Sequence, residues 1–330
     1  MNWSGKRVLV TGAGGFIGSH LTEALVRAGA RTRTLVRYDS RGSWGHLTDL
    51  EADVRSQLEV LAGDVRDRDR TLEAVRGCDV VFHLAALIAI PYSYRAVASY
   101  LATNVEGTFN VLEACRQAQV GRLVHTSTSE VYGTAQICPI DERHPLHAQS
   151  PYAASKVGAD QLAGSYHASF GLSVVTVRPF NNFGPRQSAR AVIPTIISQA
   201  LSRDEIELGA TDPVRDFLYV GDTARGFLAA AAAGPDAEGE VFNLGTGRGV
   251  TIGQVVEEVG RQLGRKLNVR SSGERQRPAN SEVMRLICSA DKAGQRLGWQ
   301  SEIGLEEGLA RTIRWIDAHR ADYRPDQYTV

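Results

Sequence analysis

The sequence predicts a doubly wound α/β fold, in which a parallel sheet is covered by helices on both faces. Apolar runs of strand length alternate with longer stretches of helical period, as expected of parallel strands buried on both faces. A glycine-rich turn at residues 11–18 lies between the first strand and the first helix. Tyr152 and Lys156, far along the chain, lie one helical turn apart and point to chemistry at the same sheet edge.

Each expected strand is a short apolar run, and each expected helix is a longer stretch with apolar residues at helical spacing. The first helix is closed by Gly29. The expected strands are Arg7–Thr11, Thr32–Arg37, Leu58–Ala62, Val80–Ala85, Leu123–Ser127 and Ser173–Arg178. The expected helices are Ser19–Ala28, about Tyr100–Gln119, Tyr152–Phe170 and about Ile193–Leu201.

The order of these elements predicts two regions. Residues 1–180 form a Rossmann-type domain for NAD(P), and residues 181–330 form a smaller, partly interleaved α/β region for the substrate. Segments at about 212–245 are candidates to return to the first domain.

Composition excludes several classes of partner. Lys plus Arg equals Asp plus Glu at 37 each, so we expect no nucleic-acid partner and no membrane surface. No signal peptide is recognised, and the apolar run 227–233 is too short to span a bilayer, which predicts a cytoplasmic protein. The eight histidines and four scattered cysteines lack ligand spacing, so no metal site is expected.

The glycine turn predicts a dinucleotide site. Gly12, Gly15 and Gly18 leave room for a pyrophosphate at the N-terminus of the following helix, where free N–H groups favour negative charge. Asp64 follows the third strand and either accepts a hydrogen bond from the adenine amino group or is a solvated turn residue.

The end of the second strand bears on the choice between NAD and NADP. Val36 stands where an acidic residue would bind the ribose 2′-hydroxyl, and Arg37 and Arg41 offer guanidinium groups to a 2′-phosphate. With no carboxylate expected there, the sequence favours NADP over NAD. The alternative is that both arginines are solvated or serve the substrate.

The pair Tyr152 and Lys156 predicts acid–base chemistry, because an ammonium near the nicotinamide ribose lowers the pKa of a tyrosine. Thr128, 24 residues before the tyrosine, lies in a segment that follows the fifth strand and carries hydroxyls and the carboxylate of Glu130. Strand ends of a parallel sheet meet at one edge, so this segment faces the same crevice.

With these residues in place, the chain resembles the extended short-chain dehydrogenase/reductase family, specifically its nucleotide-sugar epimerases, decarboxylases and 4,6-dehydratases. The resemblance runs from Lys6 to Trp315. It rests on motifs at residues 83–86, 103–108, 178–181, 184–186, 215–217 and 297–299.

The resemblance implies a role for each candidate residue and a nucleotide-diphosphate sugar as ligand. It also implies a homodimer formed by the two long helices. The implied catalytic residues are Thr128, Ser129, Glu130, Tyr152 and Lys156. The implied cofactor contacts are Gly12, Gly15, Phe16, Ile17, Gly18, Arg37, Asp64, Val65, Leu84, Ala85, Ala86, Tyr152 and Lys156. The implied substrate contacts are Ser93, Asn181, Arg186, Arg215 and Arg277.

Glu130 favours 4,6-dehydration, because the plain 4-epimerases of the family that the chain resembles usually carry a threonine at this position. The glutamate would remove the C5 proton after oxidation at C4. Segments at 86–94, 125–136 and 277–283 resemble the NAD-dependent dehydratases of the legionaminic-acid pathway, which act on nucleotide-linked N-acetylglucosamine.

Two alternatives remain open. Familiar dTDP-glucose dehydratases carry Asp where this chain has Ser129, and Thr-Ser-Glu also resembles the uronic-acid decarboxylases, so a UDP-glucuronate 4-epimerase or decarboxylase is the second hypothesis. A regulator without catalysis is disfavoured, because such proteins typically lose Tyr152 or Lys156. The sequence leaves open the nucleotide, the sugar, the C5 stereochemistry, the leaving-group acid and the pathway.

Overall fold

A seven-stranded parallel sheet forms the centre of the computed structural model, which describes residues 1–275 and 282–327. Its strand order, β10-β6-β5-β4-β1-β2-β3, confirms the predicted doubly wound fold. The strands are β1 (Arg7–Thr11), β2 (Arg31–Arg37), β3 (Glu59–Gly63), β4 (Val80–His83), β5 (Arg122–Thr126), β6 (Val174–Pro179) and β10 (Val241–Leu244).

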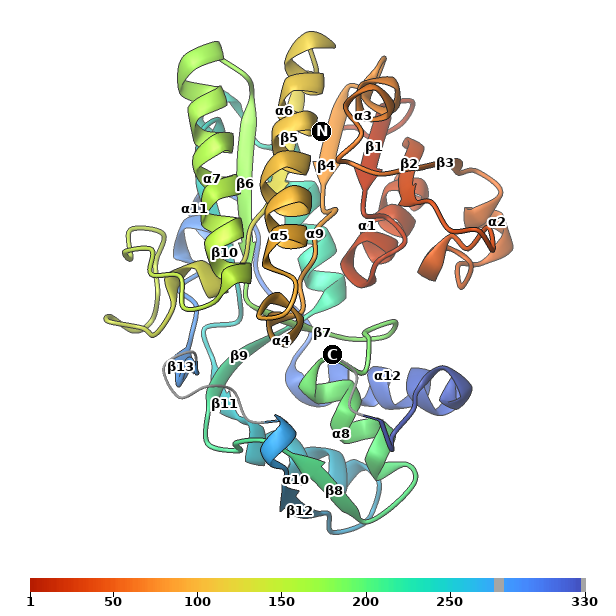
Figure 1. The fold of residues 1–330 in the computed structure, drawn as a ribbon, viewed down its shortest axis with the longest axis vertical. Coiled ribbons are helices and arrows are strands. Elements are labelled where there is room, and N and C mark those ends of the chain that lie inside the picture. The colour runs from red at the N-terminus through yellow and green to blue at the C-terminus, as the bar shows by residue number, and fades with distance from the viewer. Residues whose placement is uncertain (276–281, 328–330) are drawn as a thin grey trace.

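Helices cover both faces of this sheet (Figure 1). Successive residues of a strand point to opposite faces, so Val8 and Val10 pack in one core cluster and Leu9 packs in the other. One layer contains α3 (Arg68–Val75), α6 (Gly107–Gln117) and α7 (Pro151–Phe170), and the other contains α1 (Phe16–Arg27), α9 (Val220–Ala232) and α11 (Asp291–Leu297). Short helices α2 (Ala52–Arg55), α4 (Ile90–Ser93) and α5 (Val97–Tyr100) lie between them in the chain.

Helix α7 has clear sequence signals at both ends. Ser150 caps its N-terminus by accepting a hydrogen bond from the backbone N–H of Ala153 at 3.1 Å, and Pro151 occupies the first turn. Gly171 ends the helix in the left-handed conformation with φ of 65°. These ends fix where Tyr152 and Lys156 lie along the sheet.

The helix predicted at about 100–119 is not a regular α-helix. A π-helical segment, Leu101–Glu106, separates α5 from α6. Within it the side chain of Asn104 accepts from the N–H of Leu87 at 2.8 Å and donates to the carbonyl of Leu87 at 2.9 Å. This side chain therefore joins the π-helical segment to the chain that follows β4, as such segments often do near functional sites.

The remaining elements lie below the large sheet in Figure 1 and carry two small sheets. Helix α9 packs on α1, and β10 pairs with β6. Both elements, which lie within residues 220–244, therefore belong to the large sheet and its covering helices. A domain boundary at 180 stays a prediction. The small sheets contain β7 (Asn181–Phe183), β9 (Val214–Tyr219), β11 (Gly249–Thr251) and β13 (Arg285–Leu286), and β8 (Glu205–Leu208) with β12 (Asn268–Ser271). The helices here are α8 (Val192–Ala200), α10 (Ile252–Gln262) and α12 (Leu305–Ala318).

None of the helices in the described ranges is both long enough and apolar enough to cross a membrane.

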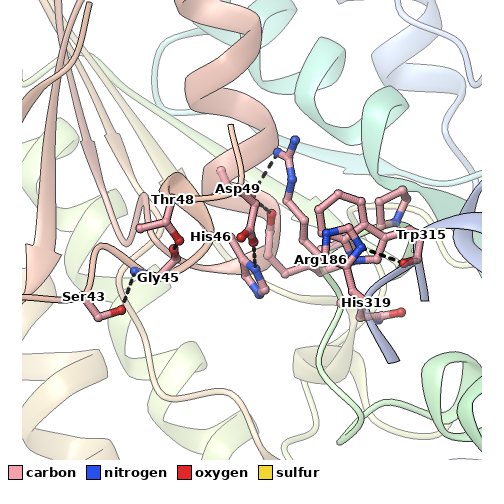
Figure 2. Close-up of polar contacts among 12 residues, drawn as sticks. Ser43, Gly45, His46, Thr48, Asp49, Arg186, Trp315 and His319 are labelled. Carbon is pink, nitrogen blue, oxygen red and sulfur yellow. Dashed lines mark hydrogen bonds and ion pairs between the residues drawn. The ribbon is translucent and has the colours of Figure 1, made fainter. Parts of the chain in front are cut away.

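Arg186 joins the two parts of the molecule. Its buried guanidinium forms an ion pair with Glu23 of α1 at 2.8 Å and lies 5.7 Å from the ring centroid of Trp315 of α12. Figure 2 shows this arginine beside Trp315 and the loop that carries His46. The residue also has a positive φ of 67°, uncommon for a side chain larger than glycine, which indicates that its surroundings hold it in place.

The position of Arg186 predicts a loss of stability on its removal. Arg186→Met leaves Glu23 without its buried partner and should lower the free energy of unfolding by about 2 kcal/mol, less than for a fully buried pair because Glu23 is partly exposed. Adding Glu23→Gln should recover part of that loss. Urea denaturation measures both.

Arg27→Met is the matched control, because Arg27 also pairs with Glu23 but is exposed, and it should change the free energy of unfolding far less than Arg186→Met. The prediction is contradicted if Arg186→Met leaves the free energy of unfolding unchanged and greatly weakens ligand binding. That result would support the substrate contact that the resemblance implies for Arg186.

Candidate active site

A cavity of about 1360 Å³ runs along the carboxyl edge of the large sheet and into the second part of the molecule. Parallel doubly wound sheets bind their ligands at this edge. The cavity wall includes the glycine turn, the ends of β2 to β5, the start of α7 and residues around α8 and β9. It brings together most of the residues predicted from the sequence.

The glycine turn is packed too tightly for side chains. A Cβ on Gly18 would lie 2.2 Å from the carbonyl oxygen of Gly12, and one on Gly12 would lie 2.7 Å from the backbone nitrogen of Ala85. Gly15 precedes α1 without a side-chain cap, which leaves N–H groups at the helix start for an anion. These features fit the pyrophosphate of a dinucleotide.

The loop after β2 contains a carboxylate, and the prediction that none is present was wrong. Asp39 lines the cavity with Arg37, and its carboxylate accepts the N–H of Arg41 at 2.8 Å. The prediction considered only the strand end at Val36, whereas Asp39 follows three residues later and residues 35–40 all line the cavity. Further along the same loop, the N–H of His46 donates to the carbonyl of Gly14 at 2.9 Å. The loop therefore lies directly against the glycine turn.

The other residues that were predicted to contact the cofactor also line the cavity. Asp64 forms an ion pair with Arg66 at 2.6 Å, and this hydrogen bond is the main reason that the pKa of Asp64 is lowered. Its contact with adenine stays a prediction. The remaining members on the wall are Phe16, Ile17, Val65, Leu84, Ala85 and Ala86.

The end of β4 is held by side-chain hydrogen bonds, which explains why the strand stops at His83. Backbone N–H groups of Leu84 and Ala85 both donate to Oγ1 of Thr11 at 3.2 Å. His83 is buried between Thr11 at 2.8 Å and Thr108 at 3.0 Å. The histidine is thus a structural residue, and the two residues after it turn into the cavity.

Thr128, Ser129 and Glu130 come from a short 3₁₀ turn, η3 (Ser129–Tyr132), that follows β5. Oγ1 of Thr128 accepts the N–H of Glu130 at 3.2 Å and caps this turn. All three residues line the cavity together with Tyr152 and Lys156 from α7. The structure therefore brings the five predicted catalytic residues to one wall.

Burial controls the acid–base state of the Tyr–Lys pair. It raises the pKa of Tyr152 well above the ordinary value, and a hydrogen bond with Thr128 opposes this effect. It lowers the pKa of Lys156 to about 8, opposed by the negative charge of Asp160. The lysine Nζ donates to the carbonyl of Thr126 at 2.5 Å. Lowering of the tyrosine pKa by Lys156 stays a prediction for the enzyme with its dinucleotide bound.

The far end of the cavity has groups suited to an anionic ligand. Nδ2 of Asn181 is buried and has no hydrogen-bond partner within residues 1–275 and 282–327, so a donor is available at the wall. Arg215 also lines the cavity, and its guanidinium forms an ion pair with Glu282 at 3.0 Å. The sequence did not single out Glu282 as a member of the site.

The structure separates two other candidates from these residues, and a third lies outside the described ranges. Ser93 is buried inside the turn of α4, where its hydroxyl donates to the carbonyl of Ile90 at 2.6 Å, and it is not part of the cavity wall. Arg186 lies at the junction of the two parts, away from the wall. Arg277 lies outside the described residues.

Two further residues near the site were missed for different reasons. Asn104 acts through tertiary contacts, and besides Leu87 it donates to Oγ of Ser155 at 2.9 Å. Arg190 lines the cavity from the segment before α8, and nothing in its sequence neighbourhood marks it as a site residue.

The chain matches a family of known proteins over most of its length. The model of the GDP-mannose 4,6-dehydratase family matches residues 9–312. The dTDP-glucose 4,6-dehydratase of Actinoplanes sp. is 34% identical over 321 residues, which cover 96% of this chain and 99% of that protein.

Two solved structures share the fold along their whole length. DesIV, the dTDP-glucose 4,6-dehydratase of Streptomyces venezuelae determined with NAD bound, is 31% identical with a TM-score of 0.86, covering 97% of this chain and 99% of that one. The UDP-N-acetylglucosamine 4-epimerase of Methanobrevibacter ruminantium is 29% identical with a TM-score of 0.86, covering 96% and 99%. With its glycine turn, Tyr–Lys pair and Thr-Ser-Glu turn on one cavity, this chain belongs to the GDP-mannose 4,6-dehydratase family of extended short-chain dehydrogenases/reductases.

Proposed function

We propose that this protein is an NDP-sugar 4,6-dehydratase, with a nucleotide-linked N-acetylglucosamine as substrate. One observation carries the proposal: the carboxylate of Glu130 shares the cavity wall with Tyr152, and its charge acts on the phenol. Oxidation at C4 needs one acid–base group, whereas removal of the C5 proton needs a second. The cavity holds both.

The residues of the chain divide the reaction between them. Tyr152 takes the proton of the sugar 4-hydroxyl, and Thr128 hydrogen-bonds to the phenol. The nicotinamide ring, when bound, supplies the hydride acceptor for C4 and the hydride donor for C6. Glu130 removes the C5 proton, which the 4-keto group has made acidic. The C6 hydroxyl then leaves as water, and the resulting C5=C6 double bond would take the hydride at C6 and a solvent-derived proton at C5 to give the 4-keto-6-deoxy sugar.

The leaving hydroxyl needs a proton, and Ser129 lacks the carboxyl group found in familiar dTDP-glucose dehydratases. Ser129 is buried on the cavity wall beside Glu130. We assign the proton to Glu130 itself, delivered directly or through a water, because the glutamate carries that proton after acting at C5.

The substrate proposal follows the resemblance to the legionaminic-acid pathway dehydratases and the fit to a solved relative. That relative, from Methanobrevibacter ruminantium, is a UDP-N-acetylglucosamine 4-epimerase of the same fold. Arg215 and the free donor of Asn181 suit the diphosphate, which accepts several hydrogen bonds.

Ser129 also favours a second candidate, a UDP-glucuronate 4-epimerase or decarboxylase. Neither reaction expels a hydroxyl, so neither needs a carboxylic acid at this position. The two hypotheses predict different changes in product mass.

The proposed partner of α5, α6 and α7 is a second copy of this chain, as the resemblance implies. Val97, Leu101 and Phe109 expose 42%, 50% and 38% of their surface on these helices and the π-helical segment. Exposed apolar side chains along one element favour an interface.

The first prediction tests the reaction class. Purified protein is incubated with UDP- and GDP-N-acetylglucosamine, dTDP-glucose and UDP-glucuronate, and the products are measured by mass spectrometry. We expect one N-acetylglucosamine nucleotide to lose one water. Loss of carbon dioxide from the uronate, or an isomer of unchanged mass, would instead establish the second candidate.

The second prediction tests the base. Glu130→Gln removes the group that takes the C5 proton, so exchange of C5–H with deuterated solvent should fall by about 10²–10⁴-fold. Reduced nicotinamide should still form on adding substrate, because Tyr152 is intact. Glu257→Gln, at an exposed position of α10, should change neither signal. Persistent exchange in Glu130→Gln would show that another group is the base.

The third prediction concerns the cofactor. Asp39 on the wall would repel a 2′-phosphate, which shifts the expected cofactor from NADP, favoured by the sequence, to NAD. Dinucleotide released from the purified protein by acid should be NAD when identified by mass. Asp39→Asn should improve binding of added NADP to the emptied protein. Release of NADP from the wild-type protein would mean that Arg37 outweighs Asp39.

A further inference from the structure

A buried polar cluster lies behind the catalytic wall, and of its members only Ser127 also lines the cavity. Asp160 is its centre, one helical turn after Lys156 on α7. Its carboxylate accepts hydrogen bonds from Nε2 of His125 at 3.1 Å and from Oγ of Ser127 at 2.7 Å. It also accepts two from Arg178, at 3.2 and 2.9 Å. Four donors from two strands and the segment after β5 thus meet one carboxylate on α7.

The cluster continues from Arg178 to the turn that carries Glu130. Nη1 of Arg178 donates to the phenol oxygen of Tyr132 at 2.9 Å, and the guanidinium lies 5.0 Å from the centre of the tyrosine ring. The phenol in turn donates to Oδ1 of Asn243 in β10 at 2.8 Å. Tyr132 is fully buried and is the last residue of η3.

We propose that Tyr132, Arg178 and Asp160 are positioning residues that hold Glu130 in place relative to Tyr152, an inference that rests on the proposed function. Thr128 to Glu130 lie between Ser127 and Tyr132, and both of these are bound by the same Asp160–Arg178 pair. The same aspartate is part of the helix that carries Tyr152 and Lys156. One ion pair therefore connects the two segments that supply the catalytic groups.

The local structure of the turn requires such a connection. A 3₁₀ turn of four residues has few internal hydrogen bonds, so its position depends on outside contacts. Thr128 caps its start, and Tyr132 anchors its end. We expect loss of the end anchor to let the turn, and with it the carboxylate of Glu130, shift relative to the C5 proton, while Tyr152 keeps its place on α7.

A purely structural role is the alternative, and buried ion pairs often add little net stability. The two roles differ in what a small change does. A structural group affects the stability of the whole fold. A positioning group affects one chemical step in protein that remains folded.

Tyr132→Phe makes that small change, because it removes only the phenol oxygen that links Arg178 to Asn243. We expect C5–H exchange in deuterated solvent to fall by about tenfold to a hundredfold, as for a misplaced catalytic group. Formation of reduced nicotinamide and the KM for the nucleotide sugar should each change by no more than about twofold. Tyr166→Phe, which removes a phenol hydrogen bond to Glu113 elsewhere on α7, is the matched control and should change none of these.

Asp160→Asn provides a second test at the centre of the cluster. An amide cannot accept all four donors, so both the Glu130 turn and its link to α7 are disturbed. Here hydride transfer and C5–H exchange should both fall in folded protein. Unchanged exchange per folded molecule in Tyr132→Phe, with only a lower Tm, would overturn the proposal.

Glu130→Gln separates this inference from the proposed function. If Glu130→Gln loses exchange and Tyr132→Phe keeps it, the positioning role is wrong and the base assignment stands. If Glu130→Gln keeps exchange, another group is the base, and the base assignment on which this inference rests fails.

Discussion

Hydrogen bonding between β1 and its two neighbours determines where chemistry occurs in this molecule. β1 pairs with β2 on one side and with β4 on the other. The connections after β1 and β4 therefore run to opposite sides of the sheet, which leaves a crevice at the carboxyl ends of these strands. The parallel register places Thr11, His83 and His125 in one row. The glycine turn, the Leu84–Ala86 segment and the Thr128–Glu130 turn each begin at or just after that row, which is why residues so distant in sequence share one wall.

Burial behind this row sets the electrostatics of the site. Asp160, Arg178 and Lys156 are all buried, and Arg178, His125 and Lys156 together hold the pKa of Asp160 near 2 against the effect of burial. The same exclusion of water raises the pKa of Tyr152 and lowers that of Lys156. An anionic ligand in the cavity favours the charged lysine, so ligand binding and the acid–base state of the Tyr–Lys pair are linked.

The sequence predicted the strands, the helices and the glycine turn, because local periodicity and glycine spacing determine them. It missed the features that depend on side-chain contacts between residues distant in the sequence. The strands lie within about two residues of their predicted bounds, since apolar runs in a two-sided sheet are distinctive. Arg186 could not be placed, because its partner Glu23 lies 163 residues earlier. The π-helical segment is held by Asn104 reaching Leu87, and the sequence does not show which residues of the loop after β2 face the cavity.

The choice among reactions is harder to predict than the fold for a physical reason. Relatives named as dehydratases and as epimerases both occur at about 30% identity to this chain, and structures of both kinds share its scaffold. Both reactions begin with the same proton removal by a tyrosine. They diverge only afterwards, at C5, where a carboxylate has to reach one hydrogen atom. Under the proposed mechanism, Glu130 supplies this carboxylate and the turn that Tyr132 anchors to Arg178 sets its position. On that proposal, reaction specificity depends on the buried cluster behind the wall as well as on the wall itself.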